Sequence, residues 1–206
     1  MKRILSLAPL AVLLSIPSFQ PRCVGAEDAA AGTWQSLFSG KDLEGWVTMH
    51  DAVFVATNGN LRLVGGMGWL RTAHPHTNFI FETEWRALEP GYDSGLFFRA
   101  GLEGKPWPKE GWQVNLLGAA LGGLVKGYKT VVPAETPPAP VNQWVKFRLE
   151  VRGKKITLQV NGEPAWEYDR LDASHGYLGI QAENKAFEFR NMRVLTLRED
   201  ADAGSR

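Results

Sequence analysis

The sequence predicts an all-β fold, an antiparallel β-sandwich or jelly roll, and three observations support this class. Short runs in which apolar and polar residues alternate recur along the chain, and such alternation gives a strand one dry and one wet face. Residues typical of tight turns separate the runs. No stretch keeps a helical period, because glycine and proline interrupt the whole length. Many short strands with tight turns between them are typical of a sandwich.

Six runs carry the alternation, in chain order. They span residues 60–64, 79–85, 95–99, 144–151, 156–160 and 186–194. Arg152–Lys155 and Asn161–Gly162 each join two strands, and Asn58–Gly59 precedes the first run. Asparagine and glycine both tolerate a positive φ, so these pairs predict tight hairpins. Segment 133–142 contains four prolines and is predicted to be a loop.

Residues 1–26 have the pattern of a secretory signal peptide. Lys2 and Arg3 precede a mostly apolar run at 4–19, and small residues lead to a cleavage point after Ala26. A membrane anchor is the alternative, but the run is interrupted by serine and proline and is short for a span. We therefore expect a secreted or periplasmic protein. Its parts would be a short linker at 27–32, a single sandwich domain at 33–197 and a disordered tail at 198–206.

Cysteine usage and charge narrow the function classes. The predicted cleavage removes Cys23, the one cysteine, which excludes a disulfide, a thiolate nucleophile and a cysteine-ligated metal from the mature chain. Of the 23 basic residues, Lys2, Arg3 and Arg22 are also removed, which leaves 20 against 22 acidic ones. No basic run is present. We expect no nucleic-acid partner and no membrane partner after signal removal, and the oligomeric state stays open.

Several phrases of the sequence resemble one known family. They are LFSGKDLEGW at 37–46, DSGLFFR at 93–99, GWQVNLL at 111–117, VNQW at 141–144, VNG at 160–162, IQAE at 180–183 and EFRN at 188–191. Taken in this order, from about residue 33 to 196, they resemble the 3-keto-disaccharide hydrolase domain family. The resemblance implies a concanavalin A-like sandwich. It also implies an exported enzyme that acts on glycosides already oxidised to a ketone at carbon 3.

The ketone determines what such a site needs. A carbonyl at carbon 3 acidifies the proton on carbon 2, so a general base can remove it and form an enolate. The enolate then expels the glycosidic oxygen from carbon 1, and water adds back. The site needs a base of tuned pKa, a group that polarises the carbonyl oxygen and an acid near the leaving oxygen. The substrate would be a small glycoside or oligosaccharide. The alternative is a non-catalytic carbohydrate-binding sandwich.

Four residues are the candidate catalytic groups. Glu183 is the predicted general base, since it follows Gln181 at a strand exit where relatives carry histidine or glutamate. Asp93 lies at a glycine-flanked bend, where it acts as a base or hydroxyl acceptor, or only closes an Asx-turn. Arg99 ends a hydrophobic strand, and its fork suits vicinal hydroxyls or an enolate oxygen. The alternative is an outward-facing strand arginine that pairs with Glu84. Glu84 is itself a candidate acid or base if its strand face lines the cleft.

The predicted substrate-binding residues are amides, a hydroxyl, a lysine and tryptophans. They are Ser94, Trp69, Trp107, Trp112, Gln113, Asn115, Lys126 and Gln181. The tryptophans offer flat faces for sugar rings, and Lys126 would polarise a carbonyl. Gln113, Asn115 and Gly118 stand where the family usually has glutamate, glutamine and aspartate. A glutamine cannot take up a proton, so these departures favour the non-catalytic alternative.

No cofactor is predicted. His74 and His76 flank a proline, and two histidines at this spacing can chelate a divalent metal. A structural zinc site needs four ligands, and nothing nearby in the sequence completes the set. We therefore predict no metal site, with a divalent metal left as an open alternative.

Overall fold

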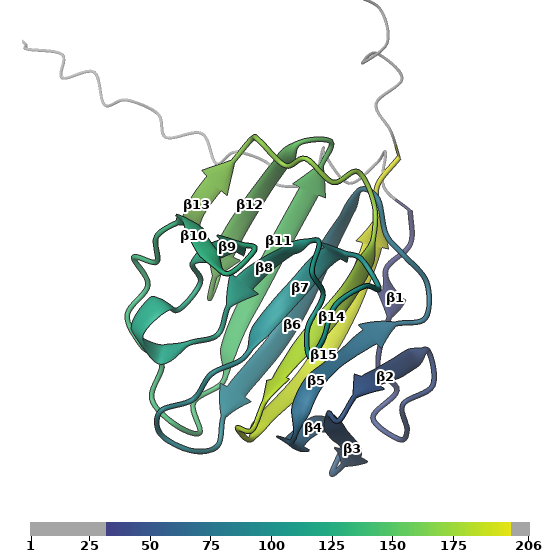
Figure 1. Cartoon of the computed structure of the whole chain (residues 1–206), viewed down its shortest axis with the longest axis vertical. Coiled ribbons are helices and arrows are strands. Elements are labelled where there is room, and N and C mark those ends of the chain that lie inside the picture. The colour runs from purple at the N-terminus through teal and green to yellow at the C-terminus, as the bar shows by residue number, and fades with distance from the viewer. Residues whose placement is uncertain (1–31, 199–206) are drawn as a thin grey trace, which may run out of the picture.

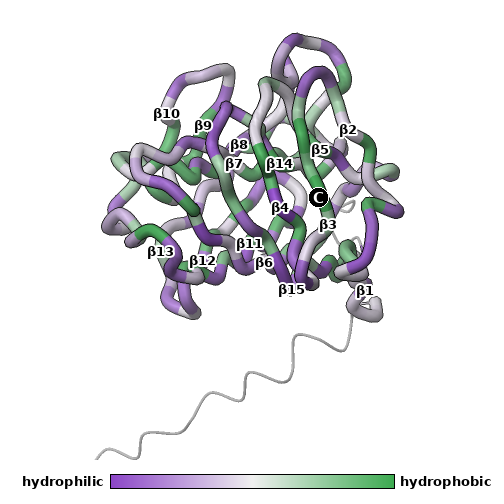
Figure 2. Tube along the Cα trace, turned by 90° about the horizontal axis from the view of Figure 1, so that it is seen from below, coloured by the Kyte–Doolittle hydropathy of each residue, from purple (hydrophilic) through white to green (hydrophobic). Residues whose placement is uncertain are grey.

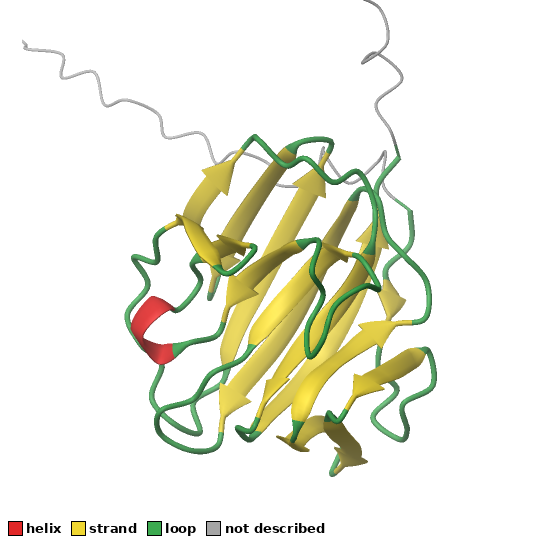
Figure 3. Ribbon diagram, in the orientation of Figure 1, coloured by secondary structure: helices red, strands yellow, loops and turns green. Residues whose placement is uncertain are grey.

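The computed structural model describes residues 32–198 and confirms the all-β prediction (Figure 1). Two antiparallel sheets lie one over the other, as Figure 2 shows along the strands. Within the described residues the one helical element is a 3₁₀ turn at Gly118–Ala120, and strands and loops make up the rest (Figure 3). The predicted signal peptide at 1–26 lies outside the described residues, as do 27–31 of the linker and 199–206 of the tail.

The eight-stranded sheet has the order β13–β12–β11–β6–β15–β4–β3, with β1 paired to β15. The bounds are β1 Gln35–Ser36, β3 Val53–Thr57, β4 Asn60–Gly65, β6 Phe79–Ala87, β11 Val145–Arg152, β12 Lys155–Val160, β13 Glu163–Tyr168 and β15 Phe187–Thr196. Strands β6 and β15 are the longest, and they lie side by side at the middle of the sheet.

The seven-stranded sheet has the order β10–β9–β8–β7–β14–β5–β2. Its bounds are β2 Trp46–His50, β5 Met67–Thr72, β7 Gly95–Ala100, β8 Trp112–Asn115, β9 Leu124–Lys126, β10 Lys129–Val132 and β14 Tyr177–Glu183. β14 pairs with β7 on one side and β5 on the other, so its side chains lie in the middle of this sheet.

The predicted turns and strands are confirmed where the alternation was clearest. All six predicted runs fall on strands, namely β4, β6, β7, β11, β12 and β15. Asn58 and Gly59 have φ values of 51° and 76° between β3 and β4. Asn161 and Gly162 have 53° and 90° between β12 and β13. Positive φ at both central residues is the geometry that the right-handed twist of a hairpin favours. Segment 133–142 contains no strand.

The core fills the space between the sheets. On β11 every second residue is buried, from Val145 to Val151, which leaves the alternate residues on the outer face. Trp85 is fully buried and contacts Phe147 edge to face at 5.6 Å. Polar side chains are thereby left to the two outer faces, one on each sheet. The described residues include no helix of the length and apolarity needed to span a membrane.

Candidate functional site

A row of amide side chains crosses the outer face of the seven-stranded sheet. Gln113 and Asn115 lie on β8, and Gln181 lies on β14. The Nε2 of Gln113 donates to Asn115 Oδ1 at 3.1 Å and to Gln181 Oε1 at 2.5 Å. The Nε2 of Gln181 then donates to Glu183 Oε2 at 2.7 Å. We call Asn115, Gln113 and Gln181 the amide row, and it ends on the carboxylate of Glu183.

The amide row bridges β7 because that strand has no side chain at the crossing point. Gly95 lies on β7 opposite Asn115, and a Cβ on Gly95 would sit 2.0 Å from the Nε2 of Gln113. Any larger residue would displace the Gln113 amide from Gln181. Gly95 therefore makes the contact between β8 and β14 possible.

Asp93 is brought to Glu183 by the residues on either side of it. Ser94 is fully buried, and its Oγ donates to the backbone carbonyl of Gln181 at 2.8 Å. Tyr92 points into the core, and its hydroxyl bonds the carbonyl of Ala139 at 3.0 Å. The bend 91–94 is thus fixed to β14. Ser94, predicted to bind substrate, instead positions Asp93.

Asp93 and Glu183 form a pair of carboxyl groups with raised pKa values. Burial raises the pKa of Asp93. Burial, and then the negative charge of Asp93, raise the pKa of Glu183. Two carboxyl groups that repel each other titrate as a coupled pair, in which one keeps its proton while the other is ionised. Such groups are suited to proton transfer, and they often mark functional sites.

An aromatic wall stands beside the amide row. Trp107 is half-buried, and its indole Nε1 donates to the carbonyl of Ala182 at 3.0 Å. The ring of Tyr128 lies 6.2 Å from it and is 70% exposed. Sequence reasoning missed Tyr128. Its φ of 63° in the turn after Gly127 is unusual for an aromatic residue, and an aromatic side chain in a strand-to-strand turn was the available signal.

A hollow of about 400 Å³ opens beside the same end of β14. It is lined by His50, Asp51, Met67, Lys105 and Pro106. Met67 is the strand partner of Glu183, so the hollow adjoins the carboxyl pair. Its size lies within the range of small-ligand pockets.

Comparison with known families agrees with the sequence motifs. The family described as the 3-keto-alpha-glucoside-1,2-lyase-like domain matches residues 33–195. The chain belongs to this family. No curated protein matches the chain.

Solved structures share the fold of this lyase-like domain. A Parabacteroides distasonis protein assigned as a glycosyl hydrolase is 19% identical, with a TM-score of 0.67, and the match covers 80% of this chain and 94% of that one. The carbohydrate-binding module CBM66 from Bacillus subtilis is 16% identical, with a TM-score of 0.62 and coverage of 72% and 93%. A Bacillus subtilis protein of unknown function with a galectin-like fold is 14% identical, with a TM-score of 0.64 and coverage of 82% and 98%.

Arg99 does not join the carboxyl pair of the lyase-like domain. A register shift in the pairing of β7 with β14 gives Arg99 a φ of 47° and turns it toward one end of the sandwich. Its guanidinium is buried and donates to the carbonyls of Thr77, Gly153 and Ala173, and to Asn78 Oδ1. All five N–H groups are used. The expectation that Arg99 faces the cleft with Glu183 is wrong, and Arg99 ties loops together instead.

Glu84 is also separated from the carboxyl pair. It lies on β6 of the eight-stranded sheet, on the opposite outer face of the sandwich. Its carboxylate accepts from Arg190 at 2.8 Å and from Asn191 at 2.8 Å. Burial would raise the pKa of Glu84, but these hydrogen bonds and the nearby charges lower it. The predicted convergence of Glu84 with Glu183 is therefore wrong.

Three predicted ligand contacts offer no free surface at the amide row, although Trp69 is the strand partner of Gln181 on the same face. Trp69 is only 1% exposed, because it lies across Gly179 and edge-on to Phe97. Trp112 is 2% exposed and points into the core, on the face of β8 opposite to Gln113. Lys126 is the strand partner of Trp112 and forms an ion pair with Asp172. Neither indole offers a free face to a sugar, and Lys126 does not reach the amide row.

The histidines predicted as possible metal ligands lie in a connecting loop. His76 forms an isolated bridge with Gly176, and burial, followed by the charge of His74, lowers its pKa. Across residues 32–198, no group of three or more His, Cys, Asp or Glu side chains is arranged to hold a metal ion.

Proposed function

We propose that this domain cleaves 3-keto-glycosides by removing the proton from carbon 2 and eliminating the group at carbon 1. The observation that carries the proposal is the Asp93–Glu183 pair, with both pKa values raised. Membership in the lyase-like family supports the substrate class. The similarity to a protein assigned as a glycosyl hydrolase and to a carbohydrate-binding module supports a sugar ligand.

Glu183 acts as the base in this reaction. A carboxylate whose pKa is raised holds a proton more strongly than an ordinary one, so it accepts the carbon 2 proton more readily. The Gln181 amide that bonds Glu183 Oε2 orients the carboxylate. The carbon–hydrogen bond breaks, its electron pair enters the enolate of the carbon 3 ketone, and the proton passes to Glu183.

Asp93 supplies the acid. The reactive form of the pair holds its one proton on Asp93 and leaves Glu183 ionised; it is the less populated of the two singly protonated forms, because the charge of Asp93 raises the pKa of Glu183. The enolate electrons form a double bond between carbons 1 and 2 and expel the glycosidic oxygen, which takes the proton of Asp93. Asn115 uses Oδ1 to accept from Gln113, so its Nδ2 group remains to donate to the enolate oxygen. Addition of water across the double bond completes a net hydrolysis.

A non-catalytic carbohydrate-binding role is the second candidate, and Gln113 favours it. Its amide occupies the centre of the row, where it donates to two side chains but cannot transfer a proton. Trp107 and Tyr128 would still supply a stacking surface. In this role Asp93 and Glu183 would only accept hydrogen bonds from sugar hydroxyls.

Turnover of p-nitrophenyl 3-keto-α-glucoside separates the two roles. We expect release of nitrophenol, and in D₂O we expect deuterium at carbon 2 of the product. The product incubated alone in D₂O corrects for spontaneous exchange. Binding without release at high protein concentration would establish the binding role. Release without enzyme-dependent deuterium would instead indicate ordinary glycoside hydrolysis.

We further propose that the protein acts outside the cytoplasm, as the sequence of residues 1–26 indicates. Expression of the full chain and N-terminal sequencing of the exported product should give Glu27 as the first residue. A product that retains Met1 would contradict export by cleavage.

A further inference from the structure

A second hollow lies on the other outer face of the sandwich. It is a groove of about 770 Å³ on the eight-stranded sheet, bounded by β6, β15 and the segment 34–40. The Asp93–Glu183 pair lies on the outer face of the opposite sheet, so the proposed reaction makes no use of this groove. Its volume is in the range that holds a small ligand.

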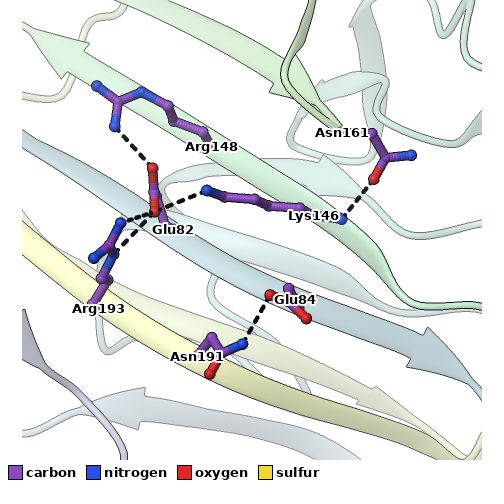
Figure 4. Close-up of polar contacts among 7 residues, drawn as sticks. All are labelled: Glu82, Glu84, Lys146, Arg148, Asn161, Asn191 and Arg193. Carbon is purple, nitrogen blue, oxygen red and sulfur yellow. Dashed lines mark hydrogen bonds and ion pairs between the residues drawn. The ribbon is translucent and has the colours of Figure 1, made fainter.

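Glu82 forms the floor of the groove and holds three cations (Figure 4). It is 6% exposed. Arg148 Nη1 contacts Oε1 at 3.0 Å, and Arg193 Nη2 and Lys146 Nζ contact Oε2 at 2.7 and 3.2 Å. Burial alone would raise the pKa of Glu82, but the hydrogen bonds from Arg193, Arg148 and Lys146 together lower it. One carboxylate thus gathers three positive charges, which leaves an excess of two.

The neighbouring charges do not cancel this excess. Glu150 contacts Arg148 at 3.7 Å but pairs more closely with Arg152, at 2.8 Å, so Arg152 offsets its charge. Glu84 accepts from Arg190 at 2.8 Å and from Asn191 at 2.8 Å, which makes that pair neutral in itself (Figure 4 shows the Asn191 contact). The side chains of Lys146 and Arg193 both line the groove and are 46% and 47% exposed, so N–H groups that Glu82 does not use are accessible there. An anion there would accept charge-assisted hydrogen bonds from both.

Arg193 is held in place before any ligand arrives. The guanidinium of Arg193 lies 4.3 Å from the centre of the Trp34 ring, in addition to its bonds to Glu82. A preorganised donor loses less conformational entropy on binding, which favours affinity. Trp34 and Arg193 both line the groove.

The walls are polar and suit hydroxyl groups. Ser36, Ser39, Asn60 and Asn191 line the groove with hydroxyls and amides. A groove of this volume exceeds the needs of an inorganic anion alone. We propose that it binds a saccharide that bears a negatively charged group, a carboxylate or a sulfate. The charged group would lie between Lys146 and Arg193, with the sugar hydroxyls along the amide and serine walls.

Calorimetric titration of the full chain tests this assignment. We expect trigalacturonate to bind and α-1,4-galactotriose, its neutral counterpart, to bind at least about tenfold more weakly, the difference that one charge-assisted hydrogen bond makes. Binding should weaken as NaCl is added. Comparison of glucuronate with glucose 6-sulfate then identifies which anionic group is preferred, and stronger binding of either one agrees with the proposal.

Matched variants locate the binding. Lys146→Gln and Arg193→Gln should each weaken trigalacturonate binding by about tenfold. Lys155→Gln removes the same charge from the same sheet outside the groove and should leave binding unchanged. Glu183→Gln should also leave it unchanged, which keeps this site distinct from the proposed reaction. Thermal unfolding confirms that each variant is folded. Three results would overturn the proposal: equal binding of trigalacturonate and α-1,4-galactotriose, an affinity for inorganic sulfate equal to that for trigalacturonate, or no effect of Lys146→Gln and Arg193→Gln.

Discussion

The two outer faces of this sandwich use glutamate in opposite ways. On the eight-stranded sheet, Glu82 is buried and contacts three cations, and they lower its pKa. On the seven-stranded sheet, Glu183 contacts an amide and lies near a second carboxyl group, Asp93, and its pKa is raised. Both residues lie on strands at the middle of their sheets, β6 and β14.

The groups in contact with a carboxylate determine its role. A carboxylate surrounded by cations is a poor base, because protonation would sacrifice several ion pairs, so it serves structure and recognition. A carboxylate with no cation beside it stays basic. Burying such a carboxylate lowers folding stability, and a cost of this kind is common at catalytic sites.

The largest expected effect is on turnover. Glu183→Gln should lower kcat/KM for the 3-keto-glucoside by about 10²–10⁴, the range that a general base contributes. The glutamine keeps the shape, so substrate binding should persist. Glu163→Gln is the matched control, since Glu163 is exposed on β13 of the other sheet. Unchanged turnover in Glu183→Gln would remove Glu183 as the base.

Glu82→Gln should lower the stability of the fold and leave turnover unchanged, the opposite of Glu183→Gln. Loss of the shared anion leaves three cations close together, and we expect a loss of about 3 kcal/mol in unfolding free energy. For a domain of this size that lowers Tm by about 6–12 °C. Turnover of the folded fraction should stay near that of the parent protein. Chemical unfolding in urea measures the change, and a Tm within 2 °C or so of the parent would show that the cation cluster carries little stability.

Gly95→Ala tests whether the amide row affects Glu183. The new Cβ would displace Gln113, and Gln181 would lose the bond that orients it toward Glu183. We expect kcat/KM to fall about tenfold, the worth of one oriented hydrogen bond, and the acidic limb of its pH profile to move to higher pH. Gly101→Ala is the control, since its Cβ would meet nothing closer than 3.6 Å. An unmoved pH profile would show that Gln113 does not act through Glu183.

The smallest expected effect is on how stability changes with pH. The Asp93–Glu183 pair and Glu82 should change it in opposite directions. The raised pKa values of Asp93 and Glu183 mean that the folded state holds more protons than the unfolded state just above their ordinary values of 3.8 and 4.5. Stability should therefore fall as pH rises through the raised values. The lowered pKa of Glu82 gives stability above its ordinary value of 4.5, and that part is lost as pH falls below it.

Urea unfolding across a pH series measures both slopes. Glu183→Gln should flatten the decline on the high-pH side and leave the low-pH loss in place. A variant that flattens neither side would contradict the assignment of the raised pKa values to this pair.

Local pattern was sufficient for much of the fold. The alternation of apolar and polar residues predicted β6 and β11, because a strand with one buried and one solvent-facing side has a sequence period of two residues. The position of Gln113 on the outer face also fixes Trp112 as a core residue, since neighbours on a strand point to opposite sides. That parity was available in the sequence, and it argues against Trp112 as a ligand contact.

The wrong predictions for Glu84, Arg99 and Lys126 have one cause: each depends on how the strands are arranged in the folded chain. Glu84 was correctly placed on a wet face, but sequence could not say which of the two outer faces β6 supplies. Arg99 follows a register shift, and an irregularity of this kind rotates a side chain out of the alternation. The pairing of Lys126 with Trp112 joins strands whose register only the folded chain defines. Glu183 and Asp93 were predicted from the family motifs; in the structure they are close enough for the charge of Asp93 to raise the pKa of Glu183, and their catalytic role stays a prediction.

The guanidinium of Arg99 has a consequence for how the sandwich opens. It joins carbonyls at Thr77, Gly153 and Ala173, three loops that are distant in sequence. None of these loops can leave its place without breaking contacts that hold the other two. That end of the domain should therefore open as one cooperative unit, and native-state amide exchange in the three loops should share a single opening free energy. The Gly153 amide, which donates to Asn78, is the natural reporter of that event.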